Sequence, residues 1–301
     1  MHDIIIVGGG PAGLTAALYA LRAGKKVLII EKNGFGGQMT FSPKIENYPG
    51  FESVSGSELA DKMVEQVLAQ GADVTVEEVI RIEPHAAGTK NVVTDVARYE
   101  AKAVILATGA KHRLLGVEGE TKFVGDGISF CAVCDGAFYE GKDVIVVGGG
   151  NSALQEALLL SETSKSVTVV QNLDDFTGEK KLSDLLLAKQ NVIVHFGKTV
   201  TEFVGGDVLS GVVVCDKDGR KETLLCDGVF IAIGLAPENE AFSDLVELNR
   251  GYIEADESGA TKTSGIFTAG DCRVKSVRQI ATAVSDGAIA GLAACEFIDR
   301  M

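Results

Sequence analysis

Apolar runs alternate with stretches of helical period along this chain, and one such arrangement occurs twice. Residues 3–31 and residues 143–171 each pass from a short apolar run through a glycine-rich turn and a helix-like stretch into a second apolar run. The two segments align without a gap at an offset of 140 residues. Each predicts a strand–helix–strand unit, because parallel strands need a helix-sized crossover between them. The fold class we predict is therefore α/β, with two Rossmann-like, doubly wound nucleotide-binding domains.

Later parts of the pattern place the second domain inside the first. Three more apolar runs end at glycine, and an Ala-rich stretch at 279–298 predicts a C-terminal helix; the runs are residues 104–109, 228–234 and 265–271. The simplest arrangement gives one domain residues 1–112 and 242–301, and inserts residues 113–241 as the other domain. The chain would then cross between the domains near residues 110–115 and 237–242.

Charge and composition narrow the classes of partner. The chain has 301 residues, is 46% hydrophobic and carries a formal net charge of −14. A surface this acidic argues against nucleic acid or an anionic membrane as partner. No secretory signal opens the sequence, and we expect no apolar stretch to approach the roughly 18 residues that span a bilayer. We therefore expect a cytoplasmic protein without a membrane partner.

The first glycine turn has the features of a dinucleotide site. Gly8-x-Gly10-x-x-Gly13 follows a predicted strand and opens a predicted helix. The first glycine allows the turn, the second lets a pyrophosphate approach the backbone, and the third lets helix and strand pack closely. Glu31 ends the next strand, where its carboxylate can accept a hydrogen bond from a ribose hydroxyl. The motif itself does not distinguish FAD from NAD, since both use it.

A pair of thiols precedes the second glycine turn. Cys131 and Cys134 are separated by two residues, and Asp135 follows directly. Such a pair can close a small disulfide ring and supply an attacking thiolate, and an adjacent carboxylic acid can transfer the proton. Half a zinc site is the alternative, but the other cysteines, Cys215, Cys226, Cys272 and Cys295, form no second pair of this spacing. We therefore predict a redox-active pair and no metal.

These motifs together resemble one known family. The chain is similar along nearly its whole length to the small bacterial class of thioredoxin reductase, a group of FAD-dependent disulfide reductases. The stretches that carry the resemblance are Gly8-Gly-Gly-Pro-Ala-Gly13, Gly36-Gly-Gln38, Ile45-Glu-Asn-Tyr-Pro-Gly50, Ala107-Thr-Gly-Ala110, Cys131-Ala-Val-Cys-Asp135, Gly148-Gly-Gly-Asn-Ser-Ala153, Thr268-Ala-Gly-Asp271 and Arg278-Gln279.

The resemblance implies a cofactor, partners and roles for particular residues. One cysteine of the pair would contact flavin, the other would attack the disulfide of a thioredoxin-like protein, and Asp135 would be the acid. The family is homodimeric and swings its inserted domain between two poses, with the two crossings as hinges. The residues expected to bind FAD are Gly8, Gly10, Pro11, Ala12, Gly13, Glu31, Lys32, Gly37, Gln38, Asn47, Ala107, Thr108, Gly109, Gly270, Asp271, Arg278, Gln279 and Ile280.

The sequence departs from that family where NADPH would bind. The NADPH-using members carry a His-Arg-Arg stretch after the second unit's last strand, and its cations bind the 2′-phosphate. Here residues 169–177 read VVQNLDDFT, and no Lys or Arg occurs between Ser166 and Glu179. NADPH is therefore a doubtful donor, and Gln171 in place of the usual acid weakens the case for NADH. The turn Gly148-x-Gly150-x-x-Ala153 is retained, either for a nucleotide or for packing alone.

Three other functions stay open at this point. A reductase that takes electrons from ferredoxin would need a basic docking patch, for which Lys111-His112-Arg113 and the trio Arg273, Lys275 and Arg278 are candidates. Dithiol oxidases of similar fold usually carry His after the cysteine pair, so Asp135 counts against that activity. A flavin-binding redox sensor without turnover is the third alternative, and the intact cysteine pair argues against it.

Overall fold

A computed structural model describes residues 1–42, 44–85 and 88–301, which divide into two units. Unit 1 comprises Met1–Lys111 and Ala236–Met301, and unit 2 is the inserted segment His112–Leu235. The crossings are strands β7 (Ala110–His112) and β16 (Leu235–Pro237), which pair with each other. The first division lies one residue before the expected boundary between residues 112 and 113, and the second lies six residues before the expected boundary between residues 241 and 242.

The segment around Asn239 explains the difference at the second crossing. Asn239 is fully buried in unit 1, where its Nδ2 donates to the carbonyls of Gly251 and Cys272. Phe242, at the end of η4 (Glu240–Phe242), is also buried in a core cluster of unit 1. Residues 236–241 thus belong to unit 1, and their assignment to the inserted domain was wrong.

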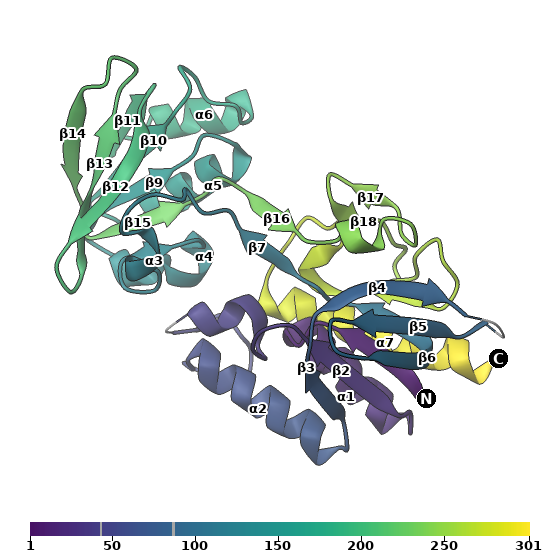
Figure 1. Ribbon diagram of the computed structural model, residues 1–301. Coiled ribbons are helices and arrows are strands. Elements are labelled where there is room, and N and C mark those ends of the chain that lie inside the picture. The colour runs from purple at the N-terminus through teal and green to yellow at the C-terminus, as the bar shows by residue number, and fades with distance from the viewer. Residues whose placement is uncertain (43, 86–87) are drawn as a thin grey trace. The chain divides into compact units, whose positions relative to one another are not determined.

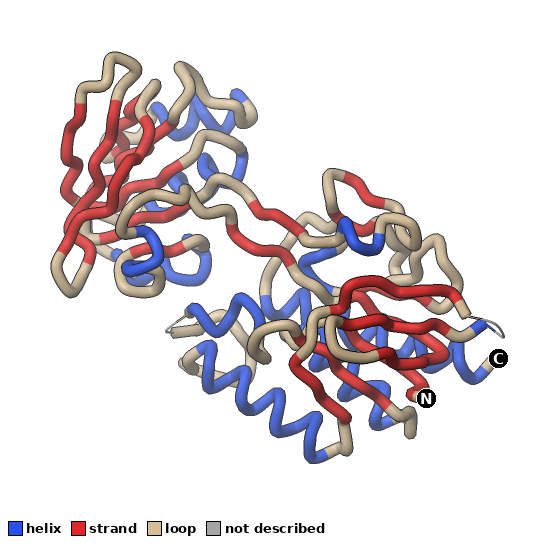
Figure 2. The backbone as a smooth tube through the Cα atoms, viewed as in Figure 1, coloured by secondary structure: helices blue, strands red, loops and turns tan. Residues whose placement is uncertain are grey.

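Unit 1 is built on a mixed sheet of order β3-β2-β1-β6-β5-β4, with β19 also pairing to β6 (Figures 1 and 2). The sheet has a parallel part, formed by β3, β2, β1, β6 and β19. Strands β5 and β4 continue it beyond β6 as an antiparallel part. The strands are β1 (His2–Val7), β2 (Val27–Glu31), β3 (Asp73–Val76), β4 (Val79–Pro84), β5 (Lys90–Thr94), β6 (Arg98–Leu106) and β19 (Ile266–Thr268). The other elements are α1 (Pro11–Arg22), η1 (Gly37–Phe41), α2 (Gly56–Ala69), β17 (Leu248–Asn249), β18 (Tyr252–Ile253), η5 (Gly270–Cys272) and α7 (Ile280–Asp299).

The two faces of this sheet bury separate cores because successive side chains of a strand point to opposite faces. Ile4 and Ile6 of β1 pack with α1 and α7 on one face. Ile5 and Val7 pack on the other face with β4, β5 and the segment around Phe242. Strands buried on both faces read as continuous apolar runs, which is why Ile4 to Val7 shows no polar alternation.

Unit 2 has a parallel sheet of order β11-β10-β9-β15-β8 and a separate antiparallel sheet of order β12-β13-β14. Its strands are β8 (Ile128–Ser129), β9 (Asp143–Val147), β10 (Ser166–Gln171), β11 (Val192–Phe196), β12 (Thr199–Gly205), β13 (Leu209–Cys215), β14 (Lys221–Leu225) and β15 (Gly228–Ile231). Its helices are α3 (Glu120–Phe123), α4 (Ala132–Asp135), η3 (Gly136–Tyr139), α5 (Asn151–Ser161) and α6 (Lys180–Leu187). One face of the parallel sheet packs on α5 and α6, and the other packs on β12 and β13 (Figure 1).

The sequence repeat is a structural repeat. Elements β1, α1 and β2 of unit 1 correspond to β9, α5 and β10 of unit 2, and both strand pairs are parallel. The α/β class and the two Rossmann-like units, one inserted in the other, are therefore confirmed.

Helix α7 corrects one expectation from the sequence. By length and composition alone it could cross a membrane. In the structure, 33% of its apolar window is buried. Its Gly287 and Gly291 lie against α1 so closely that a Cβ atom would come within 2.2 Å of the Ala12 oxygen and 2.8 Å of the Ala16 oxygen. Ala283, Ala290, Ala294 and Ile298 belong to the core on that face. We attribute the small and apolar residues on this face of α7 to the packing against α1.

Candidate active site

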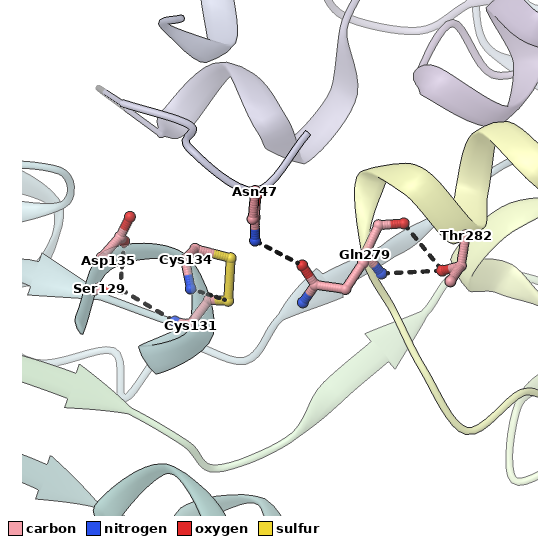
Figure 3. The surroundings of a disulfide bond; sticks show 7 residues. All are labelled: Asn47, Ser129, Cys131, Cys134, Asp135, Gln279 and Thr282. Carbon is pink, nitrogen blue, oxygen red and sulfur yellow. Dashed lines mark hydrogen bonds between the residues drawn. A yellow bond between two sulfur atoms is a disulfide. The ribbon is translucent and has the colours of Figure 1, made fainter. Parts of the chain in front are cut away.

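Cys131 and Cys134 form a disulfide in unit 2, with their Cα atoms 5.3 Å apart (Figure 3). Cys131 is the N-cap of the short helix α4, and its Sγ accepts a hydrogen bond from the Cys134 amide at 3.2 Å. Both cysteines are half-buried, Ala132 between them is buried, and Val133 is 60% exposed. The disulfide thus lies at the surface of its unit, between the buried Ala132 and the solvent-exposed Val133.

A short chain of hydrogen bonds joins this pair to Asp135. The Cys131 amide donates to Ser129 Oγ at 3.1 Å, and the Ser129 hydroxyl donates to Asp135 Oδ2 at 2.6 Å (Figure 3). The other oxygen, Asp135 Oδ1, is buried and has no hydrogen-bond partner among the described residues. Burial raises the pKa of Asp135, and the hydrogen bond from Ser129 opposes the rise only in part. A carboxyl of this kind keeps its proton to a higher pH than an ordinary one and can deliver it to a departing thiolate.

The three motif glycines of the first turn in unit 1 differ in the space around their Cα atoms: two have no room for a side chain and one does. At Gly8, whose φ is 112°, a Cβ would come within 2.2 Å of the Ala107 oxygen, and at Gly13 it would come within 1.9 Å of the Gly8 oxygen. At Gly10 the nearest atom would be the Gly37 Cα at 3.9 Å. Gly8 and Gly13 therefore serve the backbone, while Gly10 leaves space at the N-terminus of α1 for a ligand to approach.

Glu31 reaches this turn from the end of β2. Its Oε2 accepts a hydrogen bond from the Gly9 amide at 2.7 Å, and its Oε1 accepts one from the Asn33 amide at 3.0 Å. Each oxygen keeps a second lone pair for a hydroxyl donor. Glu31 also lines a cavity of about 340 Å³, together with Gly8, Lys32, Thr108 and Glu238. The cavity and the open glycine fit the ribose and pyrophosphate of a dinucleotide.

The C-terminal part of unit 1 supplies a second group of polar atoms. Asp271 Oδ1 is buried and without a hydrogen-bond partner in the described part of the chain, and the nearest cation is Lys275 Nζ at 4.0 Å. Burial raises the pKa of Asp271, and Lys275 opposes this rise. The neighbouring Gly270 amide donates to Asp286 Oδ2 at 3.1 Å. A buried carboxylate oxygen without a partner needs a hydrogen-bond donor. Asp271 Oδ1 therefore fits the hydrogen bond to the FAD that the resemblance implies for this residue.

Arg278 and Gln279 hold the start of α7. The Arg278 guanidinium donates to the carbonyls of Asp271, Arg273 and Lys275 and lies 4.2 Å from the centre of the Tyr252 ring. Gln279 caps α7, and its Oε1 accepts from Asn47 Nδ2 at 3.2 Å (Figure 3). Arg278 is therefore fixed by the backbone of its own loop, which positions the start of α7 and the loop that carries Asp271.

The remaining residues expected at the cofactor lie in unit 1 near these groups. Thr108 Oγ1 donates to Asn239 Oδ1 at 2.8 Å, and Lys32 pairs with Glu238 at 2.6 Å. Gln38 is exposed on η1. The others occupy the first turn of α1 (Pro11, Ala12), the left-handed positions Gly37 and Gly109, the buried end of β6 (Ala107) and the first turn of α7 (Ile280).

The corresponding turn of unit 2 is arranged differently. Gln171, at the position of Glu31, is only 4% exposed and lies against Gly149. Its Nε2 donates to the Asp175 carbonyl at 3.1 Å, and its Oε1 accepts from the Asn172 amide at 3.1 Å. The Gly149 carbonyl accepts hydrogen bonds from the amides of Thr177 and Gly178. The loop after β10 thus folds back onto the glycine turn.

The two basic patches considered for ferredoxin are mostly engaged within the protein. Arg273 and Lys275 are 16% and 11% exposed, and both pair with Asp286. Lys111 pairs with Glu238 at 2.9 Å. The His112 ring stacks on Phe130 at 4.8 Å, and burial lowers its pKa to about 4, so it carries no charge near neutral pH. Arg113 stays exposed, so these two candidate groups offer little unpaired positive charge for docking.

Three residues that organise these sites were not found from the sequence. Ser129 links Asp135 to the Cys131 amide, Asn239 links Thr108 to the Gly251 and Cys272 carbonyls, and Asp286 joins Gly270 to two cations. Each acts between segments far apart in sequence or lies outside a motif. Within residues 1–42, 44–85 and 88–301, no three His, Cys, Asp or Glu side chains form a group that could hold a metal ion.

Comparison with known proteins decides the family. Residues 2–287 match the family described as Pyridine nucleotide-disulphide oxidoreductase. The chain is 41% identical to thioredoxin reductase of Treponema pallidum, covering 100% of this chain and 98% of that protein. The crystal structure of thioredoxin reductase from Streptococcus pyogenes MGAS5005 superposes with a TM-score of 0.95 at 43% identity, covering 100% and 99% of the two chains. The chain belongs to the low-molecular-weight thioredoxin reductase family.

A further relative differs in how it is described. The "34.2 kDa protein in rubredoxin operon" of Clostridium pasteurianum is 41% identical over 298 residues, 98% of this chain and 97% of that protein. As a member of the family, this reductase is a flavoprotein disulfide oxidoreductase. The open turn at Gly10 and the orphaned Asp271 Oδ1 fit the FAD that the family binds.

Proposed function

We propose that this reductase passes electrons through the Cys131–Cys134 disulfide to a thioredoxin-like protein, and that its electron donor is not NADPH. The observation that carries the second part is the state of the unit 2 glycine turn, where the Gln171 amide is hydrogen-bonded at both ends within its own loop. The first part is supported by the disulfide and by relatives that are thioredoxin reductases.

The cysteine pair and its neighbours support disulfide exchange. When bound, FAD supplies two electrons to a disulfide. The half-buried pair beside the exposed Val133 can then present a thiolate to the disulfide of another protein. Asp135 lies where it can give a proton to the thiol that leaves, and Ser129 holds one of its oxygens in place. Asp135, in the position where the related dithiol oxidases usually carry His, favours the reductase.

The two repeats of the chain offer an internal comparison for the donor. In unit 1 the carboxylate of Glu31 bonds the Gly9 amide and keeps acceptor capacity for a ribose. In unit 2 the Gln171 side chain fills the equivalent place, and both its polar atoms are used by residues 172 and 175. Gln171 is uncharged and only 4% exposed, so it would bind a ribose hydroxyl of NADPH or NADH more weakly than an accessible carboxylate does.

Charge in the same loop opposes a 2′-phosphate. No Lys or Arg lies between Ser166 and Glu179, whereas Asp174 and Asp175 do. The Asp174 carboxylate is held by Lys217 Nζ at 2.5 Å, so this cation from β13–β14 is already paired. A carboxylate about 5 Å from a phosphate costs roughly 3 kcal/mol at an effective dielectric constant near 20, before salt screening.

A redox protein is the donor class that we favour, and it would have to dock elsewhere than on the paired cations Lys111, Arg273 and Lys275. FAD can accept electrons singly, so a one-electron carrier such as ferredoxin can replace a hydride donor. The relative described as a protein in a rubredoxin operon supports this choice, because rubredoxin is also an electron-transfer protein. NADH, which lacks the phosphate, is the other donor to be tested.

The donor is tested by anaerobic stopped-flow reduction of the bound flavin with NADPH, NADH and reduced ferredoxin at matched concentrations. We expect ferredoxin to reduce it fastest and NADPH slowest. Asn172→Arg with Leu173→Arg should speed NADPH about 10- to 100-fold and NADH much less, because charge-assisted bonds to phosphate contribute about 1.5–3 kcal/mol each. Val208→Arg with Leu225→Arg adds the same two charges at positions that are 68% and 77% exposed, and is the control. Fast reduction of the unmodified protein by micromolar NADPH would refute the proposal.

A homodimeric state and a cytoplasmic location stay predictions. The first follows from the resemblance to the family, and sedimentation equilibrium of the FAD-loaded protein tests it. A monomer at micromolar concentration would contradict it.

A further inference from the structure

A buried carboxyl lies directly behind the redox pair. Glu156 projects from α5, between the buried residues Ala153 and Ala157 of the same helix. The backbone of Ala132, which follows Cys131 in the chain, faces the Glu156 carboxyl and acts to lower its pKa. Its Oε2 is buried and has no hydrogen-bond partner within the part of the chain that the structure describes. The Glu156 carboxyl thus lies against the backbone of the disulfide loop, and its unpartnered Oε2 can take a proton.

Among the described residues, no cation forms an ion pair with the Glu156 carboxyl. Helix α5 packs on α4, η3, α6, β9 and β10. The titratable side chains on these elements, besides the cysteine pair, are Asp135, Tyr139, Asp143, Lys180, Lys181 and Asp184. Asp143 pairs with Lys165, and Lys180 pairs with Asp184 at the surface. Burial is the main cause that raises the pKa of Glu156 to about 8, and the Ala132 backbone opposes it.

We propose that Glu156 is a positioning residue of the redox pair, and that at alkaline pH it takes up a proton when the Cys131–Cys134 disulfide is reduced. The inference rests on the proposed function, since it takes this disulfide as the one that cycles. Reduction adds two electrons to the S–S bond, which breaks and leaves two thiolates. One thiolate takes a proton from Asp135 or water. The negative charge that remains favours transfer of a proton from water to Glu156 Oε2.

The sign of the effect follows from the two charge states. Below about pH 8, Glu156 is neutral in both the disulfide and the dithiol form, so it does not bias the equilibrium between them. Above this pH it is ionised beside the disulfide, and reduction would place a thiolate near a carboxylate in a poorly solvated region. Like charges there repel strongly, so reduction becomes harder unless a proton is taken up. Glutamine at this position keeps an acceptor facing the Ala132 backbone but removes the charge.

The test is a redox titration of the FAD-loaded protein in dithiothreitol buffers, in which the reductant supplies two electrons and two protons. Thiols are trapped with a maleimide and counted by mass spectrometry. At about pH 9.5 we expect Glu156→Gln to be reduced about tenfold more readily than the unmodified protein, a shift of about 30 mV, and at about pH 6.5 equally readily. Glu162→Gln, an exposed carboxylate at the end of the same helix, should match the unmodified protein at both pH values.

Two results would overturn the inference. Identical titrations of Glu156→Gln and the unmodified protein at both pH values would show no coupling. A shift of equal size at both values would show a purely structural role. Infrared difference spectra of the unmodified protein give an independent readout: reduction at alkaline pH should produce a protonated-carboxyl band that persists in Asp135→Asn. Neither thioredoxin nor NADPH, NADH or ferredoxin enters these experiments, so failure of the proposed function would show in the activity assays and not here.

Discussion

Gly13 has no room for a Cβ atom, whereas Gly10 has, so alanine substitutions at these two positions form a matched pair. In Gly13→Ala the new Cβ would lie 1.9 Å from the Gly8 oxygen, so α1 must move by more than an ångström away from the turn. Overpacking of this size costs about 1–3 kcal/mol or more, against about 1 kcal/mol that alanine gains over glycine within a helix. In Gly10→Ala the Cβ meets its nearest atom at 3.9 Å and the backbone φ is −82°, so alanine fits the free protein. Its methyl group would instead occupy the space left for the dinucleotide.

We therefore expect opposite effects on stability and on binding. Gly13→Ala should lower the unfolding temperature of the flavin-free protein by several degrees, since 1 kcal/mol corresponds to about 2–4 °C at this size. Gly10→Ala should leave that temperature nearly unchanged and weaken FAD about 10- to 100-fold, from an overlap of about 1–3 kcal/mol. Circular dichroism melts and fluorescence titration with FAD measure the two effects. Wild-type FAD affinity in Gly10→Ala would show that this backbone does not face the cofactor, and the binding assignment would fail.

Two further predictions concern the redox pair. Cys131→Ser and Cys134→Ser should each keep FAD bound yet abolish thioredoxin reduction, and activity retained in either variant would remove the pair from the mechanism. Asp135→Asn should slow thioredoxin reduction about 100-fold. Because burial raises the Asp135 pKa, the unmodified protein should keep its proton donor to a higher pH than an ordinary carboxyl allows and lose rate as the pH rises through that pKa. The Asn variant should lack this decline, and a pH–rate profile identical to that of the unmodified protein would exclude Asp135 as the acid.

Local patterns were sufficient to predict the units of the fold. The apolar run Ile4 to Val7, the glycine turn and the helical stretch after Pro11 are all encoded within 30 or so neighbouring residues, and the second copy begins at Asp143. The same holds for the disulfide, since cysteines separated by two residues can close a ring without any distant contact. These features depend on backbone period and spacing, which a single sequence displays.

Contacts between distant segments could not be predicted in this way. Asn239 lies in a short connection without periodicity, yet it is buried by Thr108 and Cys272, and this moved the unit boundary. Arg273 and Lys275 show their charge in the sequence but not their partner Asp286, so the sequence could name them only as candidates for a docking patch. Glu156 has the appearance of an ordinary helix carboxylate, and only the packing of α4 on α5 reveals its burial.

The two ends of unit 2 lie next to each other, since the Arg113 amide donates to the Gly234 carbonyl at 3.0 Å. A segment whose ends adjoin can be inserted into a host chain at little entropic cost, because the host closes only a short gap. The pairing of β7 with β16 makes this gap as narrow as one strand spacing. The host unit can therefore complete its sheet, with β19 beside β6, whatever the inserted segment contains. Unit 2, which carries the redox pair, can therefore be replaced by another inserted domain while unit 1 keeps its core.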